Sequence, residues 1–60
     1  MDIKIIEKGS NRGQGIGYLP DGTMVVVDKA ANKLNKNLTV EFVRFHETSA
    51  GKMIFAKISR

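Results

Sequence analysis

The stretch GQGIGYLPDGTMVVV, residues 13–27, constrains the fold more than any other part of the chain. Glycine occupies every second position at its start, a Pro-Asp-Gly sequence follows, and a run of β-branched residues ends it. Proline suits the second position of a tight turn, and glycine accepts the positive φ that follows. The stretch therefore predicts a β-hairpin, with strands at Gln14–Leu19 and Thr23–Val27.

Three roles are open for the alternating glycines. A phosphate-binding loop needs a helix that begins directly after the glycines, whereas this stretch leads into a hairpin, so that role is excluded. The other two roles are compatible with each other. Because side chains alternate along a strand, Gly15 and Gly17 share a face that lets a narrow barrel close. Ile16 and Tyr18 then share the opposite face, where an unpaired base can stack.

The rest of the chain supplies three more predicted strands, at residues 2–8, 38–46 and 52–58, and no strong helix. Residues 28–37 predict a short helical turn with Leu34 anchored in the core. We therefore predict a single domain over residues 1–60 with an all-β fold. The expected form is a small five-stranded OB-like β-barrel with a short helical turn before strand 4, and an SH3-like barrel is the alternative.

The fourth and fifth predicted strands contain the phenylalanines. Alternation places Val40 and Phe42 toward the core, so Phe45 falls on the outer face unless a bulge intervenes. In the last strand, Phe55 alternates with a face of small and medium apolar residues. It is either a core residue or a partly exposed stacking residue, and the sequence leaves both open.

Composition excludes several functions. The chain has no cysteine and one histidine, and no pair or triad of side chains suits catalysis, so we expect no enzyme activity, no metal and no cofactor. It has no apolar run of the roughly 20 residues that span a membrane, and no signal peptide, which predicts a cytoplasmic protein without a membrane partner. We expect a monomer. The net charge of +4 and the pI of about 9.8 favour polyanionic partners.

The runs GQGIGYLPDGTMVVV and ETSAGKMIFAK make residues 13–57 resemble the TRAM domain, in particular the one at the C-terminus of bacterial PIN–TRAM proteins. This resemblance implies an OB-like barrel that binds RNA and performs no catalysis. The segment DKAANKLNKN departs from the family, which has a more compact glycine-containing turn before the fourth strand. Residues 13–22 also resemble the first RNA-binding motif of cold-shock domains, with Tyr18 at one aromatic position and Ile16 where the other aromatic stands.

We therefore predict binding of single-stranded or tRNA-like RNA with low sequence specificity, either as an RNA chaperone or as the RNA-binding module of a larger protein. An initiating Met1 and a basic C-terminus at Arg60 are compatible with a complete small protein. Binding of single-stranded DNA and an SH3-like protein-interaction barrel are the alternatives. The nucleic-acid-binding candidates combine cations, a polar amide and flat or apolar side chains: Lys8, Arg12, Gln14, Ile16, Tyr18, Arg44, His46, Lys52 and Phe55.

Overall fold

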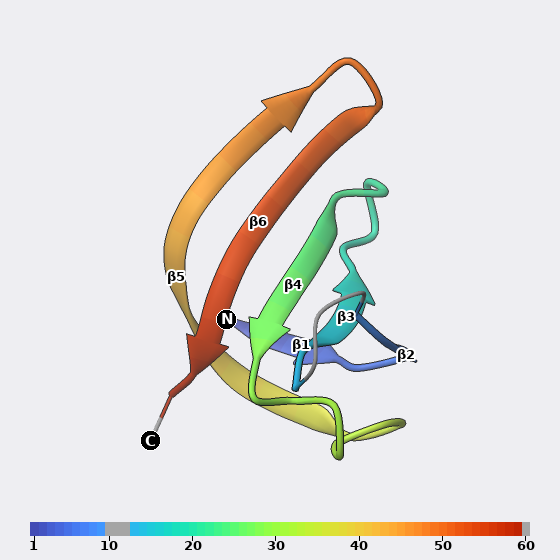
Figure 1. The fold of residues 1–60 in the computed structure, drawn as a ribbon, viewed down its shortest axis with the longest axis vertical. Helices are drawn as coiled ribbons and strands as arrows, with labels where there is room; N and C mark the ends of the chain where they lie inside the picture. Colours follow the sequence, from blue (N-terminus) through green and yellow to red (C-terminus); the bar gives the residue numbers. More distant parts are fainter. Residues whose placement is uncertain (10–12, 60) are drawn as a thin grey trace.

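The computed structural model describes residues 1–9 and 13–59 of the 60-residue chain. These residues form one curled, mixed sheet that makes a half-barrel, with the strand order β1-β5-β6-β4-β3-β2 (Figure 1). The strands are β1 (Asp2–Lys4), β2 (Glu7–Lys8), β3 (Gly15–Tyr18), β4 (Met24–Asp28), β5 (Asn37–Thr48) and β6 (Gly51–Ile58). Neighbouring strands are antiparallel except β4 and β6, which are parallel. The described residues contain no helix long and apolar enough to cross a membrane.

The N-terminal segment contributes a strand to each end of this order. Ile5 accepts a hydrogen bond from the Asn35 backbone N–H at 2.6 Å and donates one to the Lys36 carbonyl at 3.0 Å, on the β5 side. The next residue, Ile6, instead donates to the Ile16 carbonyl in β3 at 2.8 Å. The predicted strand at residues 2–8 is therefore split where the chain changes partners, and the sheet has six strands instead of the five expected.

The core lies on the concave side of the curled sheet. Strands β1, β4, β5 and β6 and the turns after β1 and β4 contribute aliphatic side chains that are less than a tenth exposed: Ile3, Ile5, Val25, Val27, Ala30, Val40 and Ala56. Burial of a valine or isoleucine side chain stabilises the fold by about 1.5–3 kcal/mol, so these few residues carry much of the stability of a chain this short.

The turn between β3 and β4 confirms the predicted β-hairpin. Gly22 donates its backbone N–H to the Leu19 carbonyl at 2.9 Å and has a φ of +92°. The Asp21 carboxylate accepts a hydrogen bond from the Thr23 N–H at 3.0 Å, which fixes the residue that leads into β4. A turn followed by a glycine at positive φ matches the right-handed twist of the flanking strands.

The predicted helical turn over residues 28–37 is wrong. This segment makes single turns, such as the hydrogen bond from the Lys33 N–H to the Ala30 carbonyl at 3.0 Å. Lys29 and Asn35 have φ values of 61° and 65°, in the left-handed region, and such residues interrupt a right-handed helix. The core anchor is Ala30, which is fully buried, whereas Leu34 is 39% exposed.

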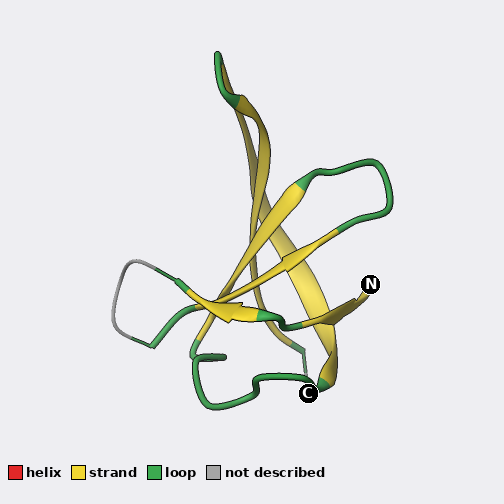
Figure 2. Cartoon of the chain, turned by 90° about the vertical axis from the view of Figure 1, so that its right-hand side faces the viewer, coloured by secondary structure: helices red, strands yellow, loops and turns green. Residues whose placement is uncertain are grey.

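The β5–β6 hairpin continues past the half-barrel and projects from it (Figure 2). β1 pairs with β5 only at residues 37–39, and every residue from 41 to 50 is exposed. The β5–β6 register shifts between Phe42 and Arg44, so a bulge at Val43 returns Phe45 to the face of Phe42. Phe42 is on the predicted face but is 55% exposed instead of buried, because it lies beyond the part of β5 that β1 covers.

Candidate nucleic-acid interface

Strands β3, β4, β6 and β5 present a convex face opposite the core, which we call the outer face. Its position follows from the register, because residues directly opposite one another in adjacent strands share a face. Val26 of β4 is opposite both Ile16 of β3 and Phe55 of β6, and Phe55 is opposite Arg44 of β5. The outer face therefore carries Ile16, Tyr18, Met24, Val26, Asp28, Met53, Phe55, Lys57, Arg44 and His46.

The two buried glycines of β3 explain why this strand has an apolar outer face and a bare inner one. A Cβ at Gly15 would lie 2.7 Å from the Ala30 carbonyl oxygen, and one at Gly17 would lie 2.6 Å from Cγ1 of Ile3. Both distances are too short for real atoms, so the chain segments under β3 can approach only if these positions carry no side chain. The structure thus places Ile16 and Tyr18 on the outer face, where Tyr18 is 44% exposed.

Arg44, Phe55 and His46 form a cluster on the outer face of the β5–β6 hairpin. The Arg44 guanidinium carbon lies 5.0 Å from the centroid of the Phe55 ring, which is the geometry of a cation–π contact. The His46 ring meets the Phe55 ring edge-on, with centroids 6.5 Å apart and an interplanar angle of 85°. Phe55, whose position the sequence left open, therefore lies half-buried on the outer face.

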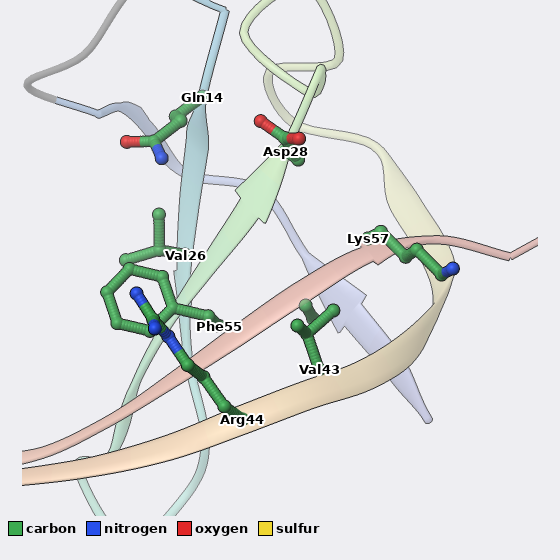
Figure 3. A pocket seen from close by; sticks show the side chains of 8 residues that line it. Gln14, Val26, Asp28, Val43, Arg44, Phe55 and Lys57 are labelled. Carbon is green, nitrogen blue, oxygen red and sulfur yellow. The ribbon is translucent and has the colours of Figure 1, made fainter.

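An open groove of about 650 Å³ runs beside this cluster (Figure 3). Val26 lies at its middle, and Gln14 and Asp28 lie together at one end, while Phe55 and Arg44 lie at the other. Ala56 also lines the groove. Val43 and Lys57 line the side formed by β5 and β6. The Lys57 ammonium points away from the groove and lies 3.9 Å from the Glu41 carboxylate, a largely exposed ion pair that contributes little to stability.

A second hollow of about 190 Å³ lies on the same side of the sheet, between the two hairpin ends. It brings Tyr18 and Lys52 together, with Met24 and Met53 between them. Near this hollow, the hydrogen bond from the Thr23 N–H lowers the pKa of the Asp21 carboxyl below its ordinary value, and the charge of Lys52 lowers it further. This end of the sheet therefore combines an exposed aromatic ring with a lysine.

The structure gathers most of the predicted binding residues, but not all of them. Gln14, Arg44 and Phe55 line the groove, His46 contacts Phe55, and Tyr18 and Lys52 share the second hollow. Ile16 lies between Tyr18 and Gln14 along the chain and is half-buried. Lys8 is opposite Gly15 in the edge strand β2, so it faces away from Ile16. Arg12 lies outside the described residues.

Sequence reasoning missed two parts of the groove. Val26, which is only 7% exposed, and Asp28 alternate with the core residues Val25 and Val27, so the period of two in TMVVVD could have assigned them to the outer face. Val43 lines the groove because of the β5 bulge, and no residue in this stretch signals a bulge.

Comparisons with known proteins agree on one family. The model of the TRAM domain matches residues 1–51. An uncharacterized PIN and TRAM-domain containing protein of Synechocystis sp. is 49% identical over 57 residues, and one of Bacillus subtilis is 42% identical over 57 residues. Each match covers 95% of this chain but 16% of the relative, so the chain spans less than a fifth of the length of these proteins. No solved structure gives a significant match.

Proposed function

Because this chain belongs to the TRAM domain family, we propose that it is an RNA-binding module that holds unpaired segments of RNA on its outer face. Binding relies on base stacking and on attraction of the phosphates to the basic chain, whose net charge is +4. Neither base stacking nor phosphate attraction depends strongly on the base sequence of the RNA. The relatives joined to a PIN domain favour a module that presents RNA to a neighbouring domain over a free-standing RNA chaperone.

The Arg44–Phe55 pair is the observation that carries this proposal. The guanidinium plane and the aromatic ring both accept a stacked base, and the contact at 5.0 Å holds the arginine over the sheet before RNA arrives. Preorganised side chains lose less conformational entropy on binding than free ones. The pair lies near the middle of the outer face, between the groove and His46.

The curled sheet supports the same function. We infer that it corresponds to a five-stranded OB-like barrel in which β1 and β2 are one strand that bends between Ile5 and Ile6. Such barrels bind oligonucleotides on the face of their sheet and between the adjoining loops. The outer face corresponds to the face of the sheet, and the hollow between the two hairpin ends corresponds to the space between the loops.

A titration with single-stranded RNA, single-stranded DNA and duplex RNA of equal length tests the proposal. We expect the tightest binding to single-stranded RNA, with an affinity that falls steeply as salt rises. Arg44→Ala should weaken binding and reduce the slope of log K against log salt by about 0.7, the value for one phosphate contact on a single strand. Absence of binding to every RNA at low salt would overturn the proposal.

A second candidate function, binding of a partner protein, is supported by the other face of the projecting hairpin. Phe42 and Phe45 are 55% and 49% exposed, and β5 has no strand on its outer edge beyond Thr39 within the described residues. An exposed edge with apolar side chains suits pairing with a strand of a partner protein. Apolar strand pairing persists at high salt, whereas RNA binding weakens, so salt titration distinguishes the two functions.

A further inference from the structure

We propose that the groove on the outer face selects a guanine base of the bound RNA through Asp28 and Gln14. This inference rests on the proposed RNA-binding function and adds a sequence preference at one nucleotide. Its basis is the asymmetry of the groove, which is apolar in the middle and carries the cation–π pair at one end and an acceptor-rich polar pair at the other (Figure 3).

The dimensions of the groove suit a base that lies flat on the sheet. Val26 and Asp28 are two residues apart on the same face of β4, which separates them by about 6–7 Å along the strand. Val26 is 7% exposed and forms the floor of the groove, beside the half-buried ring of Phe55. A base that lies over this floor can thus direct its sugar toward Arg44 and its hydrogen-bonding edge toward Asp28. The open groove volume of about 650 Å³ leaves room for a purine.

Asp28 is available to a ligand. Its side chain is exposed, and it has no hydrogen-bond or ion-pair partner among residues 1–9 and 13–59. Lys57, its neighbour across the β4–β6 pair, directs its ammonium toward Glu41 instead. A carboxylate in this position repels phosphate, so the RNA backbone is expected at the opposite end of the groove, beside Arg44.

Gln14 adds the complementary group. Its side chain lies next to Asp28 at the end of the groove, and its amide nitrogen points toward Val26 (Figure 3). Gly9 accommodates this side chain, because a Cβ there would lie 2.8 Å from the Gln14 Cβ. Asp28 therefore offers two adjacent acceptors on its carboxylate, and Gln14 offers a donor on its amide nitrogen.

Only one of the four RNA bases matches this pattern. The Watson–Crick edge of guanine has two adjacent donors, N1–H and the N2 amino group, beside the O6 acceptor. Uracil has a single donor between two acceptors, and adenine and cytosine each place an acceptor next to their amino group. For these three bases an acceptor would face the Asp28 carboxylate, which is unfavourable when both groups are partly desolvated. Guanine can instead bind the carboxylate through two hydrogen bonds, with O6 accepting from Gln14.

The test uses oligouridine strands of equal length that carry one central guanine, adenine, cytosine or uracil, with affinity measured by fluorescence anisotropy at fixed salt. We expect the guanine strand to bind about tenfold more tightly than the others, as for a bidentate contact between a side chain and a base. Asp28→Asn should reduce this preference to less than about twofold, because the amide replaces one acceptor with a donor.

Glu47→Gln is the matched control. It removes the same charge from an exposed side chain whose β6 partner is Lys52, outside the groove, and it should leave the guanine preference unchanged. Equal binding of all four strands, or a preference that survives Asp28→Asn, would overturn this inference while leaving RNA binding intact. Absence of binding to all four strands would instead overturn the proposed function.

Guanosine 5′-monophosphate distinguishes RNA from a free nucleotide as the source of the base. As a competitor of the guanine strand it should be far weaker than the unlabelled strand, because it lacks the neighbouring bases and phosphates. Equal potency of the nucleotide and the strand would overturn the assignment of this site to RNA.

Discussion

The two ends of the sheet differ in how they use their apolar residues. In the half-barrel, the inner side chains of β1 and β4 are buried, and backbone segments pack directly against the glycines of β3. In the projecting β5–β6 hairpin, Phe42, Val43 and Phe45 are each about half exposed. Natural proteins seldom leave several large apolar side chains together on a projecting strand without a use for them.

This difference separates stability from binding. Substitutions in the half-barrel should lower the free energy of unfolding, because they create cavities or clashes in a small core. Substitutions at the exposed positions of the hairpin should change the affinity for a ligand and leave stability nearly unchanged. Matched substitutions at the two ends therefore test whether the molecule is organised in this way.

The largest effect is expected for Gly17→Val. Its Cβ would collide with the Lys4 carbonyl oxygen and with Ile3, and the added methyl groups would force β1 away from β3. We expect the free energy of unfolding to fall by about 3 kcal/mol or more, which is enough to unfold much of a small domain. Circular dichroism during urea unfolding measures this loss. Gly22→Ala is the control. A Cβ at this position would meet no atom within 4 Å, but its φ of +92° suits glycine better than alanine. We therefore expect the free energy of unfolding to fall by only about 1 kcal/mol. A folded, equally stable Gly17→Val variant would refute the close packing of β1 and β3.

Valine-to-alanine substitutions compare the two ends directly. Val27 is fully buried, whereas Val43 is 52% exposed. Val27→Ala should destabilise the protein by about 2 kcal/mol through the cavity it leaves, and Val43→Ala should change stability by less than about 0.5 kcal/mol. The denaturation midpoints in urea measure both. Similar losses for the two variants would show that the projecting hairpin is packed in solution.

Phenylalanine-to-leucine substitutions compare the two faces of the hairpin. Phe55→Leu keeps an apolar side chain but removes the ring beneath Arg44, so RNA affinity should fall about tenfold. Phe45→Leu changes the same residue type on the opposite face and should leave RNA affinity within about twofold. Melting temperatures of both variants provide the folding control. Equal losses of affinity would mean that RNA contacts both faces.

The smallest effect concerns Asp21 in the β3–β4 turn. Its hydrogen bond from the Thr23 N–H lowers its pKa below the ordinary 3.8, so the folded state favours the charged carboxylate. This stabilisation is complete above pH 3.8 and is lost as the pH falls through the lowered pKa. The melting temperature of the wild type should therefore fall slightly more than that of Asp21→Asn, which does not titrate, between pH 4 and pH 2. Parallel melting curves would show that this bond contributes nothing.

The sequence predicted the parts of the fold that depend on local patterns. Alternation along β3 and the Pro-Asp-Gly turn were sufficient to place Gly17 and Tyr18 on opposite faces, as the structure has them. Local sequence patterns were less informative about how distant segments of the chain are arranged. The segment with Leu34 has a helical composition, yet Lys29 and Asn35 adopt left-handed conformations as the chain crosses from β4 to β5.

The amino-acid sequence by itself determined an all-β fold of the TRAM family, its first hairpin and the bare face of β3, because turn chemistry and a period of two act over a few residues. Only the tertiary structure decided which residues meet. The bulge at Val43 set the faces of Phe45 and Arg44, and the β4–β6 pairing brought Phe55 beside Val26, opposite the end occupied by Asp28. Such contacts join residues far apart in the chain, and their register follows from how the whole sheet curls around its core.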